Sequence, residues 1–577
     1  GHCARIFPMS DGGQANPENK GFPPLIDGEE LLGHQPCAAL VGKKFEEGTL
    51  RVSSYAVAFA SNGSIGKSGA NFVIGWAVPV GAISELKSVP GEAARLRLEC
   101  TDFRSIDLRF ESADAARAFR RDINTIAVAD CSNETSFVFA HRRASTDEEL
   151  NAWLPHDWLR QEYERLGLVS PNWRISTANA DHALIPSYPA ALVVPSCITD
   201  AEIAVAVGFR RNGRFPAVCW RHPTHGAVLY RSSQPLVGVA GRTCDEDERI
   251  VRGAVDAMGD GRGVTVIDCR SEWASVAQRL LHGGGSERLR DIHYGISKYT
   301  CLGIDNADAQ QTTFNELRES CRALSNFTLR NLTKMCAISS GKWCEQVHRI
   351  ISGACDVAEA LESRGSVLVH CNDGWNRTPQ MTSLAQLLID PYYRTFAGFQ
   401  VLIEKEWVAF GHKFALRLGH APVGRACQSP IFLQFLDAVW QILQARRHAF
   451  EFKEELLLAL ADACLERRYG TFAFDSPESA QRHDATRKTR SVWPALDARK
   501  DTLAHAKHRP VPGLLPIRLS PKEVEIWAPL YLRYADPPEA ESCEAPLPHG
   551  SPVRPLNSSP ARPLKDSPVS LSLTHMM

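Results

Sequence analysis

The chain has neither a long apolar run nor an excess of one charge, and both absences limit what it can be. No apolar stretch approaches the length of a membrane-spanning helix, and the first residues contain no signal-peptide core, so we expect a protein that does not span a membrane. Lys+Arg number 65 and Asp+Glu 66, which leaves a formal net charge of −1 at pH 7. Without a basic surplus the molecule as a whole has no field that would gather nucleic acid, so any anion site must be local.

Paired cysteines are also missing. The 17 cysteines include no Cys-x2-Cys pair and no framework of a small disulfide-rich domain. A chain of 577 residues, 44% of them hydrophobic, can form two to four domains with a large core and needs no covalent staples. Free thiols in a cytosolic setting are therefore expected, which suits a reactive cysteine.

One segment, residues 370–380, has the pattern of a phosphate-binding loop with a nucleophile at its base. It reads His-Cys-Asn-Asp-Gly-Trp-Asn-Arg-Thr-Pro-Gln and includes the end of a short apolar run, 366–370, which predicts a buried strand. Residues from Thr378 onward predict a helix. A strand that delivers a cysteine into a six-residue loop, closed by an arginine at a helix start, directs backbone N–H groups inward around a phosphoryl group.

The residue types in this loop suit phosphoryl transfer. A helix N-terminus and inward-facing amides favour the thiolate of Cys371, which would attack phosphorus. The planar guanidinium of Arg377 can hold two oxygens of the transferring group, and Gly374 permits the tight bend. Because amides and guanidinium supply the charge stabilisation, we expect neither a metal nor another cofactor. The alternative is that Cys-x5-Arg occurs here by chance and Cys371 is a structural thiol.

The loop resembles that of the myotubularin phosphoinositide 3-phosphatases, a branch of the cysteine-based phosphatases, in which it reads His-Cys-Ser-Asp-Gly-Trp-Asp-Arg-Thr. The chain keeps the central Asp-Gly-Trp at 373–375. Further segments similar to the family follow in family order, at 172–176, 220–223, 233–238, 302–306, 391–395, 404–407, 410–414 and 429–435.

This resemblance implies hydrolysis of the 3-phosphate of phosphatidylinositol 3-phosphate and of the 3,5-bisphosphate. It implies a cytoplasmic protein peripherally associated with endosomal membranes, whose partner is a phosphoinositide lipid, and it is compatible with a homo- or hetero-oligomer with related myotubularins. Carried over by position, Cys371 resembles the nucleophile and Arg377 the phosphate clamp. Substrate contacts are implied for the loop residues Asn372, Gly374 and Trp375, for Asn306, and for Lys413 and Arg417, which we expect on one helical face with Arg417 facing a 5-phosphate.

The chain departs from the family at Asn376, where active members have an aspartate thought to protonate the departing inositol oxygen. An amide cannot donate a proton and be restored, so its presence should cost roughly 10²–10⁴ in rate. Three alternatives remain: Asp373 transfers the proton, another acid does so, or the site binds 3-phosphoinositides and turns them over very slowly. A second departure is Gln278, where the family tends to place asparagine before a Gly-rich turn. Gln278 either contacts the head group or lies on the surface of an amphipathic helix.

The domain organisation follows from composition and periodicity. We expect a poorly ordered N-terminal segment at 1–36, a PH-GRAM-like domain at 37–130, a linker at 131–150, a phosphatase domain at 151–535, and a disordered Pro-rich tail at 536–577. Apolar and polar residues alternate in 95–110, which predicts a hairpin, and a helix capped by Ser112 follows. The predicted fold is α/β, or α+β layered: an enlarged cysteine-phosphatase fold with an N-terminal PH-like β-barrel.

Three functions stay open from the sequence. The first is a phosphoinositide 3-phosphatase acting through a cysteinyl-phosphate intermediate. The second is a catalytically impaired, myotubularin-like pseudophosphatase that binds 3-phosphoinositides as a scaffold. The third is a protein tyrosine or dual-specificity phosphatase, whose phenolic leaving group needs less help from an acid. The family segments outside the loop argue against the third.

Overall fold

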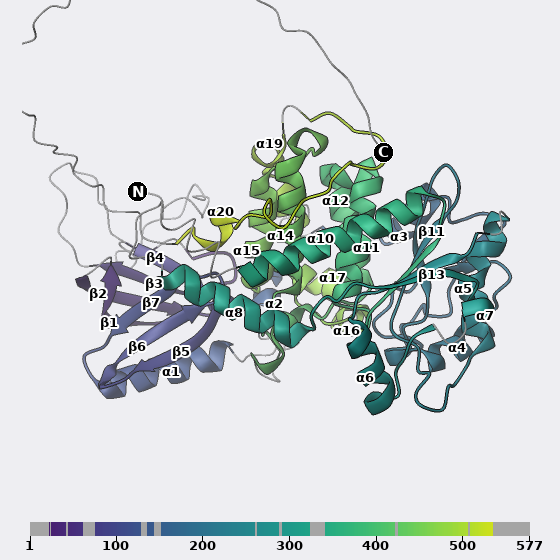
Figure 1. Ribbon diagram of the computed structural model, residues 1–577. Coiled ribbons are helices and arrows are strands. Elements are labelled where there is room, and N and C mark those ends of the chain that lie inside the picture. Colours follow the sequence, from purple (N-terminus) through teal and green to yellow (C-terminus); the bar gives the residue numbers. More distant parts are fainter. Residues whose placement is uncertain are drawn as a thin grey trace, which may run out of the picture. The chain divides into compact units, whose positions relative to one another are not determined.

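A computed structural model describes residues 22, 25–41, 44–61, 75–127, 136–143, 152–259, 262–287, 291–323, 341–421, 425–505 and 508–534. All of them belong to one structural unit, Gly1–Pro537. Most of the predicted N-terminal segment and the whole predicted tail, 536–577, lie outside the described residues. Figure 1 shows the course of the chain.

The N-terminal part is a seven-stranded antiparallel sheet with strand order β4-β3-β2-β1-β7-β6-β5. The predicted hairpin is β6-β7, in which Leu96 pairs with Leu108, and the Oγ of Ser112 accepts the N–H of Ala115 at the start of helix α1, as expected. The sheet begins at Leu31, before the predicted boundary at residue 37. Its elements are β1 (Leu31–Val41), β2 (Lys44–Ser53), β3 (Ala56–Ser61), β4 (Gly75–Pro79), β5 (Ile83–Val89), β6 (Glu92–Cys100), β7 (Ser105–Arg109) and α1 (Ala113–Ala127).

A closed PH-like barrel is not confirmed. The two edge strands, β4 and β5, share no ladder within the described residues, so the sheet is open there. The chain passes from β4 to β5 through the single 3-10 turn η2 (Val80–Ala82), and three residues span at most about 10 Å. The two edges therefore approach at one corner without pairing along their length.

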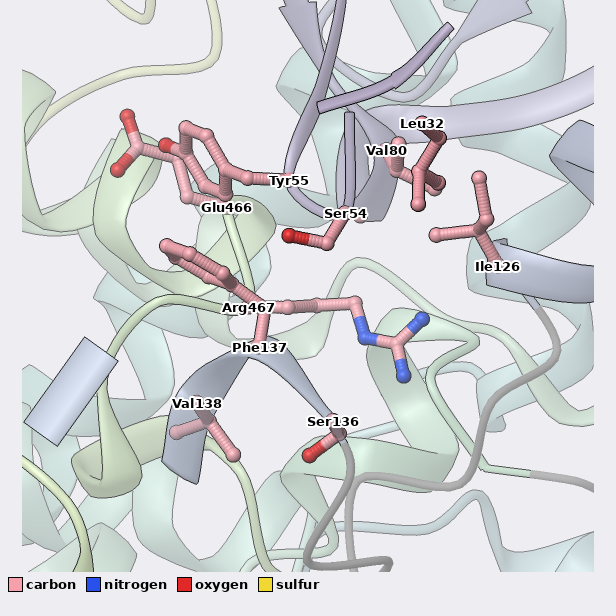
Figure 2. Close-up of a pocket in the computed structure, with 11 residues that line it drawn as sticks. Leu32, Ser54, Tyr55, Val80, Ile126, Ser136, Phe137, Val138, Glu466 and Arg467 are labelled. Carbon is pink, nitrogen blue, oxygen red and sulfur yellow. The ribbon is translucent and has the colours of Figure 1, made fainter. Parts of the chain in front are cut away.

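The predicted linker, 131–150, is partly structured. Helix α2 (Phe137–Arg143) lies within it and buries Phe137, Val138, Phe139 and His141. A pocket of about 190 Å³ is lined by this helix, by the N-terminal sheet and by Glu466 and Arg467 (Figure 2). None of the predicted site residues lines this pocket.

The predicted phosphatase domain is built on a five-stranded sheet of order β10-β11-β14-β12-β13. Strand β10 is antiparallel to β11, whereas β11, β14, β12 and β13 run parallel, so β14 lies in the middle with all its residues buried. Ligands of such sheets bind at the carboxyl ends of the parallel strands, and the predicted loop leaves β14 at that end. The strands are β10 (Ala217–Arg221), β11 (Val228–Ser232), β12 (Val264–Asp268), β13 (Ile296–Cys301) and β14 (Val367–His370), with a separate pair β8 (Trp173–Ser176) and β9 (Leu192–Pro195).

Helices cover this sheet. The long helix before the loop, α10 (Gly341–Glu362), and the helix after it, α11 (Arg377–Ile389), bury apolar residues and pack on each other and on α14 (Ile431–Ala445) (Figure 1). The remaining helices include α3 (Trp158–Arg165), α4 (Asp200–Phe209), α5 (Asp245–Met258), α6 (Glu272–His282), α7 (Asp291–Tyr294), α8 (Ala307–Ala323), α12 (Phe396–Ile403), the π-helix η7 (Glu404–Ala409), α13 (Phe414–Leu418), α15 (Glu454–Leu465), α16 (Pro477–Arg482), α17 (Ala485–Lys488), α18 (Trp493–Asp497), α19 (Lys500–Leu503) and α20 (Ala528–Tyr531).

Candidate active site

The loop between β14 and α11 wraps around the sulfur of Cys371. The Sγ of Cys371 accepts the backbone N–H of Gly374 at 3.3 Å and the hydroxyl of Thr378 at 3.2 Å. Only 2% of the residue is exposed. A sulfur that receives two hydrogen bonds at a helix start lies in a polar setting although it is buried.

This setting favours the thiolate. Burial opposes ionisation of Cys371, but the positive charge of Arg377 and the hydrogen bonds from Thr378 outweigh it, so the pKa of the thiol lies below its ordinary value. Asp373 works in the other direction, and its effect on the pKa is smaller. Cys371 therefore has the electrostatic environment of a nucleophile, not that of an inert core thiol.

Arg377, the first residue of α11, is largely buried, and its Nη1 donates to the carbonyl of Ile304 at 2.9 Å. This bond fixes the guanidinium at the helix start, where it lowers the pKa of the Cys371 thiol. The remaining N–H groups of the guanidinium have the planar geometry that suits two oxygens of a phosphoryl group.

Gly374 is fixed from outside the loop. Its backbone has φ +77°, and an added Cβ would lie 2.6 Å from the carbonyl oxygen of Ser232. The carbonyl of Gly374 accepts Nη2 of Arg214 at 2.9 Å and Nη2 of Arg231 at 3.1 Å. Two buried arginines thus set the direction of this peptide, and the bend requires glycine, as predicted.

Asp373 points to residues that the sequence did not single out. Its Oδ1 accepts Nε of Arg211 at 2.7 Å and Nδ2 of Asn212 at 2.9 Å. Both bonds fall on the same oxygen, so a proton carried by Asp373 would have to sit on Oδ2. This geometry bears on the alternative in which Asp373 replaces the missing acid.

Asn376 and Arg417 are brought together. The Nε of Arg417 donates to the Oδ1 of Asn376 at 3.4 Å, and its Nη1 donates to the carbonyl of Cys427 at 2.8 Å. Burial lowers the pKa of Arg417. The structure therefore places the predicted head-group arginine beside the residue that departs from the family.

The spacing of Lys413 and Arg417 predicted that both lie on one helix, but Lys413 lies just before the helix. Helix α13 contains five residues, and Lys413 precedes it with ψ 73°, although the N–H of Arg417 still bonds the carbonyl of Lys413 at 2.9 Å. The Nζ of Lys413 lies 4.2 Å from the ring centre of Trp375, in a cation–π contact. Both predicted residues thus contact the loop, Arg417 through Asn376 and Lys413 through Trp375.

Asn372 and Gln278 are joined by a chain of hydrogen bonds. Nη1 of Arg270 donates to the Oδ1 of Asn372 at 3.2 Å and to the Oε1 of Gln234 at 2.5 Å. The Nε2 of Gln234 donates in turn to the Oε1 of Gln278 at 3.2 Å. Gln278 lies on α6 and is half-buried. Its side chain is linked to the loop only through Gln234 and Arg270.

Asn306 stands at the start of α8. It is exposed, and its Oδ1 accepts the N–H of Ala309 at 2.9 Å, which is the contact of a helix-capping residue. The carbonyl that holds Arg377 belongs to Ile304, two residues earlier. The contact with Arg377 is thus made by Ile304, whereas the side chain of Asn306 caps α8.

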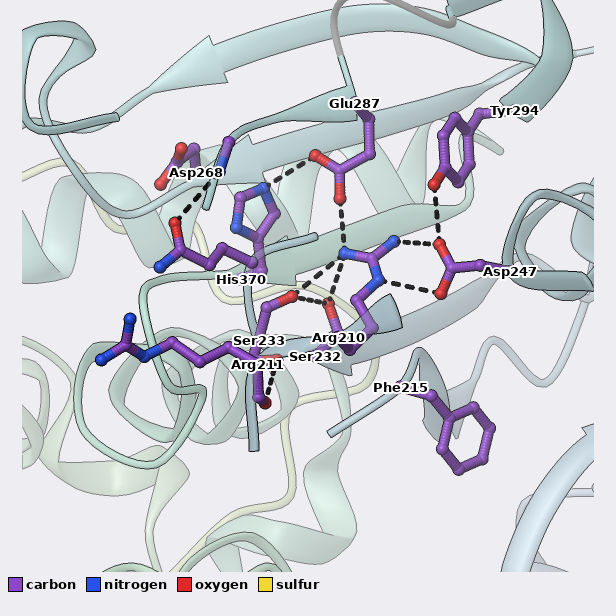
Figure 3. A network of polar contacts seen from close by, with 12 residues as sticks. Arg210, Arg211, Phe215, Ser232, Ser233, Asp247, Asp268, Glu287, Tyr294 and His370 are labelled. Atoms are coloured by element: carbon purple, nitrogen blue, oxygen red, sulfur yellow. Dashed lines mark hydrogen bonds and ion pairs between the residues drawn. The ribbon is translucent and has the colours of Figure 1, made fainter. Parts of the chain in front are cut away.

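A buried ionic network holds His370, the last residue of β14 before the loop (Figure 3). The Nε2 of His370 lies 3.1 Å from the Oε2 of Glu287, and the Oε1 of Glu287 accepts Nη1 of Arg210 at 2.6 Å. Arg210 also binds both oxygens of Asp247, at 2.9 and 2.6 Å. Burial favours neutral His370, but the charges of Glu287 and Asp268 outweigh it, so the pKa of His370 is raised. The end of β14 is thereby held in one orientation.

Four buried arginines, Arg210, Arg214, Arg231 and Arg270, were missed as site residues. Arg231 lies on β11, and Arg270 follows β12 by two residues, so both lie at the carboxyl ends of strands that flank β14. That topology was the available signal, since polar residues at these strand ends converge on the loop after the central strand.

Together these features are those of a phosphate-binding loop of the cysteine-phosphatase type. A model described as "Myotubularin-like phosphatase domain" matches residues 136–481. The phosphatidylinositol-3,5-bisphosphate 3-phosphatase MTMR2 of Bos taurus is 33% identical over 531 residues, which cover 89% of this chain and 79% of that protein. Myotubularin of Xenopus tropicalis is 32% identical over 478 residues, 80% of this chain and 77% of that protein. The chain belongs to the myotubularin family of phosphoinositide phosphatases.

Among solved structures, the N-terminal PH domain of human ARAP2 is similar over 18% of this chain and 83% of that chain, with 13% identity and a TM-score of 0.13. In the described part of the chain, no helix combines the length and the apolar character needed to cross a bilayer.

Proposed function

We propose that this protein is a phosphoinositide 3-phosphatase that acts on phosphatidylinositol 3-phosphate and phosphatidylinositol 3,5-bisphosphate through a cysteinyl-phosphate intermediate. The observation that carries the proposal is the lowered pKa of Cys371 inside a loop closed by Arg377. The relatives named above, which are similar over most of the chain, support the substrate class.

In the first step the thiolate of Cys371 attacks phosphorus, an S–P bond forms, and the bond from phosphorus to the inositol oxygen breaks. Backbone N–H groups of the loop and the guanidinium of Arg377 would hold the equatorial oxygens. In the second step water attacks the same phosphorus, the S–P bond breaks, inorganic phosphate leaves, and the thiolate of Cys371 is restored.

The departing inositol oxygen needs a proton, and Asn376 cannot supply one. Asp373 is the carboxylic acid of the loop, and its Oδ2 is the oxygen left for that proton. The proposal therefore assigns proton transfer to Asp373, at a rate below that of a site with an aspartate at position 376.

Asn376 also supports a second candidate function, a pseudophosphatase that holds 3-phosphoinositides as a scaffold. Its amide receives a hydrogen bond from Arg417, so the loop is held in a defined shape without an acid at this position. A protein tyrosine or dual-specificity phosphatase is the third candidate. The pair Lys413 and Arg417 beside the loop favours a polyanionic head group over a phosphotyrosine.

Phosphate release from phosphatidylinositol 3-phosphate separates these candidates. Native protein is compared with Cys371→Ser, Asp373→Asn and Asn376→Asp, each checked for folding by circular dichroism. We expect measurable native turnover, its loss in Cys371→Ser, a strong reduction in Asp373→Asn, and a rise of about tenfold or more in Asn376→Asp. Native turnover indistinguishable from that of Cys371→Ser, together with retained lipid binding, would establish the scaffold function instead.

The proposal extends to place and partners. We propose a cytoplasmic protein that associates peripherally with endosomal membranes, where its phosphoinositide substrate lies, and that forms homo- or hetero-oligomers with related myotubularins. Imaging of a tagged chain together with a probe for phosphatidylinositol 3-phosphate tests the location, and light scattering tests the assembly.

A further inference from the structure

The start of helix α13 is capped by a residue from a distant segment. The helix begins directly after Lys413, whose side chain forms no capping hydrogen bond. The Oδ1 of Asp475, which lies 59 residues further along the chain than Leu416, accepts the N–H of Leu416 at 2.9 Å. The first N–H groups of a helix have no partner within the helix itself, so this carboxylate satisfies a donor that would otherwise be unpaired. Asp475 therefore fixes the start of α13.

The segment that carries Asp475 is anchored in the core. It follows the 3-10 turn η10 (Gly470–Phe472), in which Phe472 is 2% exposed. The ring centre of Phe472 lies 5.0 Å from that of Phe414, the first residue of α13, and 5.5 Å from that of Phe432 on α14. Aromatic packing thus holds this segment against α13 next to the hydrogen bond. The carboxylate has a rigid support, so its charge stays in one place.

Asp475 also interacts electrostatically with both members of the basic pair. Burial raises the pKa of Asp475, whereas two N–H groups of α13 and the charges of Lys413 and Arg417 oppose this rise. In return, the charge of Asp475 favours the charged form of Arg417, although burial has the larger effect and lowers its pKa. Two cations beside one site repel each other, and a carboxylate near both reduces this repulsion. It also reduces the positive potential that the pair offers to an anion.

The basic pair contacts the phosphate-binding loop at two neighbouring residues. The Nζ of Lys413 lies 4.2 Å from the ring centre of Trp375, and the Nε of Arg417 donates to the Oδ1 of Asn376. Both cations are attached to the backbone that Asp475 holds, one just before α13 and one within it. The position of α13 therefore sets how far these charges lie from a phosphate bound in the loop.

We propose that Asp475 is a positioning and specificity-determining residue that holds Lys413 and Arg417 at the phosphate-binding loop and offsets part of their charge; this inference rests on the proposed function. Its two effects on head-group binding have opposite signs. The hydrogen bond to Leu416 fixes the pair and favours binding, whereas the negative charge weakens the attraction for a phosphorylated head group. A bisphosphate carries more negative charge than a monophosphate, so its affinity depends more steeply on the charge of Asp475.

Two substitutions separate these effects. Asp475→Asn keeps an oxygen that can accept the N–H of Leu416 and removes the charge, whereas Asp475→Ala removes both. Each is made in the full chain together with Cys371→Ser, so that bound lipid is not consumed. Isothermal titration measures the binding of water-soluble, short-chain phosphatidylinositol 3-phosphate and 3,5-bisphosphate at pH 8, well above the ordinary pKa of an aspartate. The matched control is Asp497→Asn, which removes an exposed carboxylate at the end of α18.

We expect Asp475→Asn to bind the bisphosphate about threefold or more tightly than the Cys371→Ser parent, with a smaller gain for the monophosphate. This gain should shrink as salt is added, because salt screens the charge but not the hydrogen bond. Asp475→Ala should bind both lipids more weakly than Asp475→Asn, because the start of α13 is no longer fixed. The control Asp497→Asn should bind both lipids as the parent does.

Turnover with Cys371 intact separates the possible failures. Asp475→Asn should lower KM for the bisphosphate by a larger factor than KM for the monophosphate. If native protein hydrolyses neither lipid but the binding differences appear, the proposed function fails and the role of Asp475 stands. The inference is overturned if Asp475→Asn and Asp475→Ala weaken binding equally, as a purely structural cap would, or if Asp475→Asn leaves the ratio of the two affinities unchanged. It is also overturned if the parent binds neither lipid.

Discussion

The Nε of Arg417 donates to the Oδ1 of Asn376 at 3.4 Å, so the arginine expected to face a 5-phosphate already contacts the residue that replaces the family's acid. The bond is long, and the same guanidinium is anchored by the carbonyl of Cys427. A bound head group could therefore draw Arg417 toward a phosphate without loss of its anchor, and the contact with Asn376 would be the one given up.

Replacing Arg417 should affect the bisphosphate more than the monophosphate. Arg417→Met removes a charged hydrogen-bond donor, and such bonds contribute about 1.5–3 kcal/mol, which is roughly a 10- to 100-fold change in kcat/KM. We expect a loss of this size for phosphatidylinositol 3,5-bisphosphate and a smaller one for phosphatidylinositol 3-phosphate. The control is Arg482→Met, which removes an exposed arginine of α16 paired with Glu478. Equal losses on both lipids would argue against a contact with the 5-phosphate.

Gly374→Ala should disrupt the loop. The new Cβ would lie 2.6 Å from the carbonyl of Ser232, and the position has φ +77°. The matched control is Gly259→Ala, because Gly259 has φ +64° and no heavy atom within 4 Å of an added Cβ. The control has only the strain of an alanine at positive φ, about 1 kcal/mol, whereas Gly374→Ala has this strain and the clash. We expect Gly374→Ala to lower turnover at least about 100-fold and the control to leave turnover unchanged. Similar turnover in both variants would contradict the fixed position of this peptide.

The hydroxyl of Thr378 should set part of the reactivity of Cys371. Its hydrogen bond to Sγ favours the thiolate, so Thr378→Val should raise the pKa of the thiol. The thiolate fraction falls as pH drops through the pKa, and the curve of alkylation rate against pH should therefore move to higher pH in the variant. Thr312→Val, which changes an exposed hydroxyl on α8, is the control. An unmoved curve would mean that Arg377 and the backbone alone stabilise the thiolate.

The local parts of the structure could be predicted from the sequence, and the parts assembled from distant segments could not. Strand β14, the loop and α11 follow one another within a few residues, so periodicity and spacing defined them. The hairpin β6-β7 was predicted for the same reason. Arg214, Arg231 and Glu287 support the loop from distant positions in the sequence. Arg214, for example, binds the carbonyl of Gly374, 160 residues away, and no local pattern encodes such a contact.

Two details that were expected, a shared helix for Lys413 and Arg417 and a closed barrel, are not confirmed, and the causes are similar. The spacing of Lys413 and Arg417 predicted a shared helix, but Lys413 has non-helical ψ and helix α13 ends after five residues at Gly419 in the left-handed conformation. The predicted barrel depends on pairing between β4 and β5, and alternation along a strand defines its two faces but not its neighbours. The apolar face of α6 could have been recognised from the spacing of its residues, but the sequence alone does not say that this face is exposed to solvent.

Glu404, in the π-helix η7, should make stability depend on pH. It is buried, and burial raises the pKa of its carboxyl to about 7, although a hydrogen bond at 2.6 Å from the Nε1 of Trp493 opposes this rise. Between the unfolded pKa near 4.5 and the folded value near 7, the folded state holds the proton and the unfolded state does not. The free energy of unfolding should therefore fall as pH rises through this window, by at most about 3 kcal/mol.

Glu404→Gln keeps an oxygen that can accept the Trp493 N–H and cannot ionise. The variant should lose the part of the pH dependence that Glu404 contributes, so its Tm relative to native protein should be higher at pH 8 than at pH 5. Native protein at pH 5, where Glu404 is protonated in the folded state, resembles the variant and serves as the reference. Thermal unfolding at several pH values measures this difference. A Tm difference that stays constant from pH 5 to pH 8 would show that Glu404 is ionised in the folded state throughout, because only a buried proton couples its folding to pH in this window.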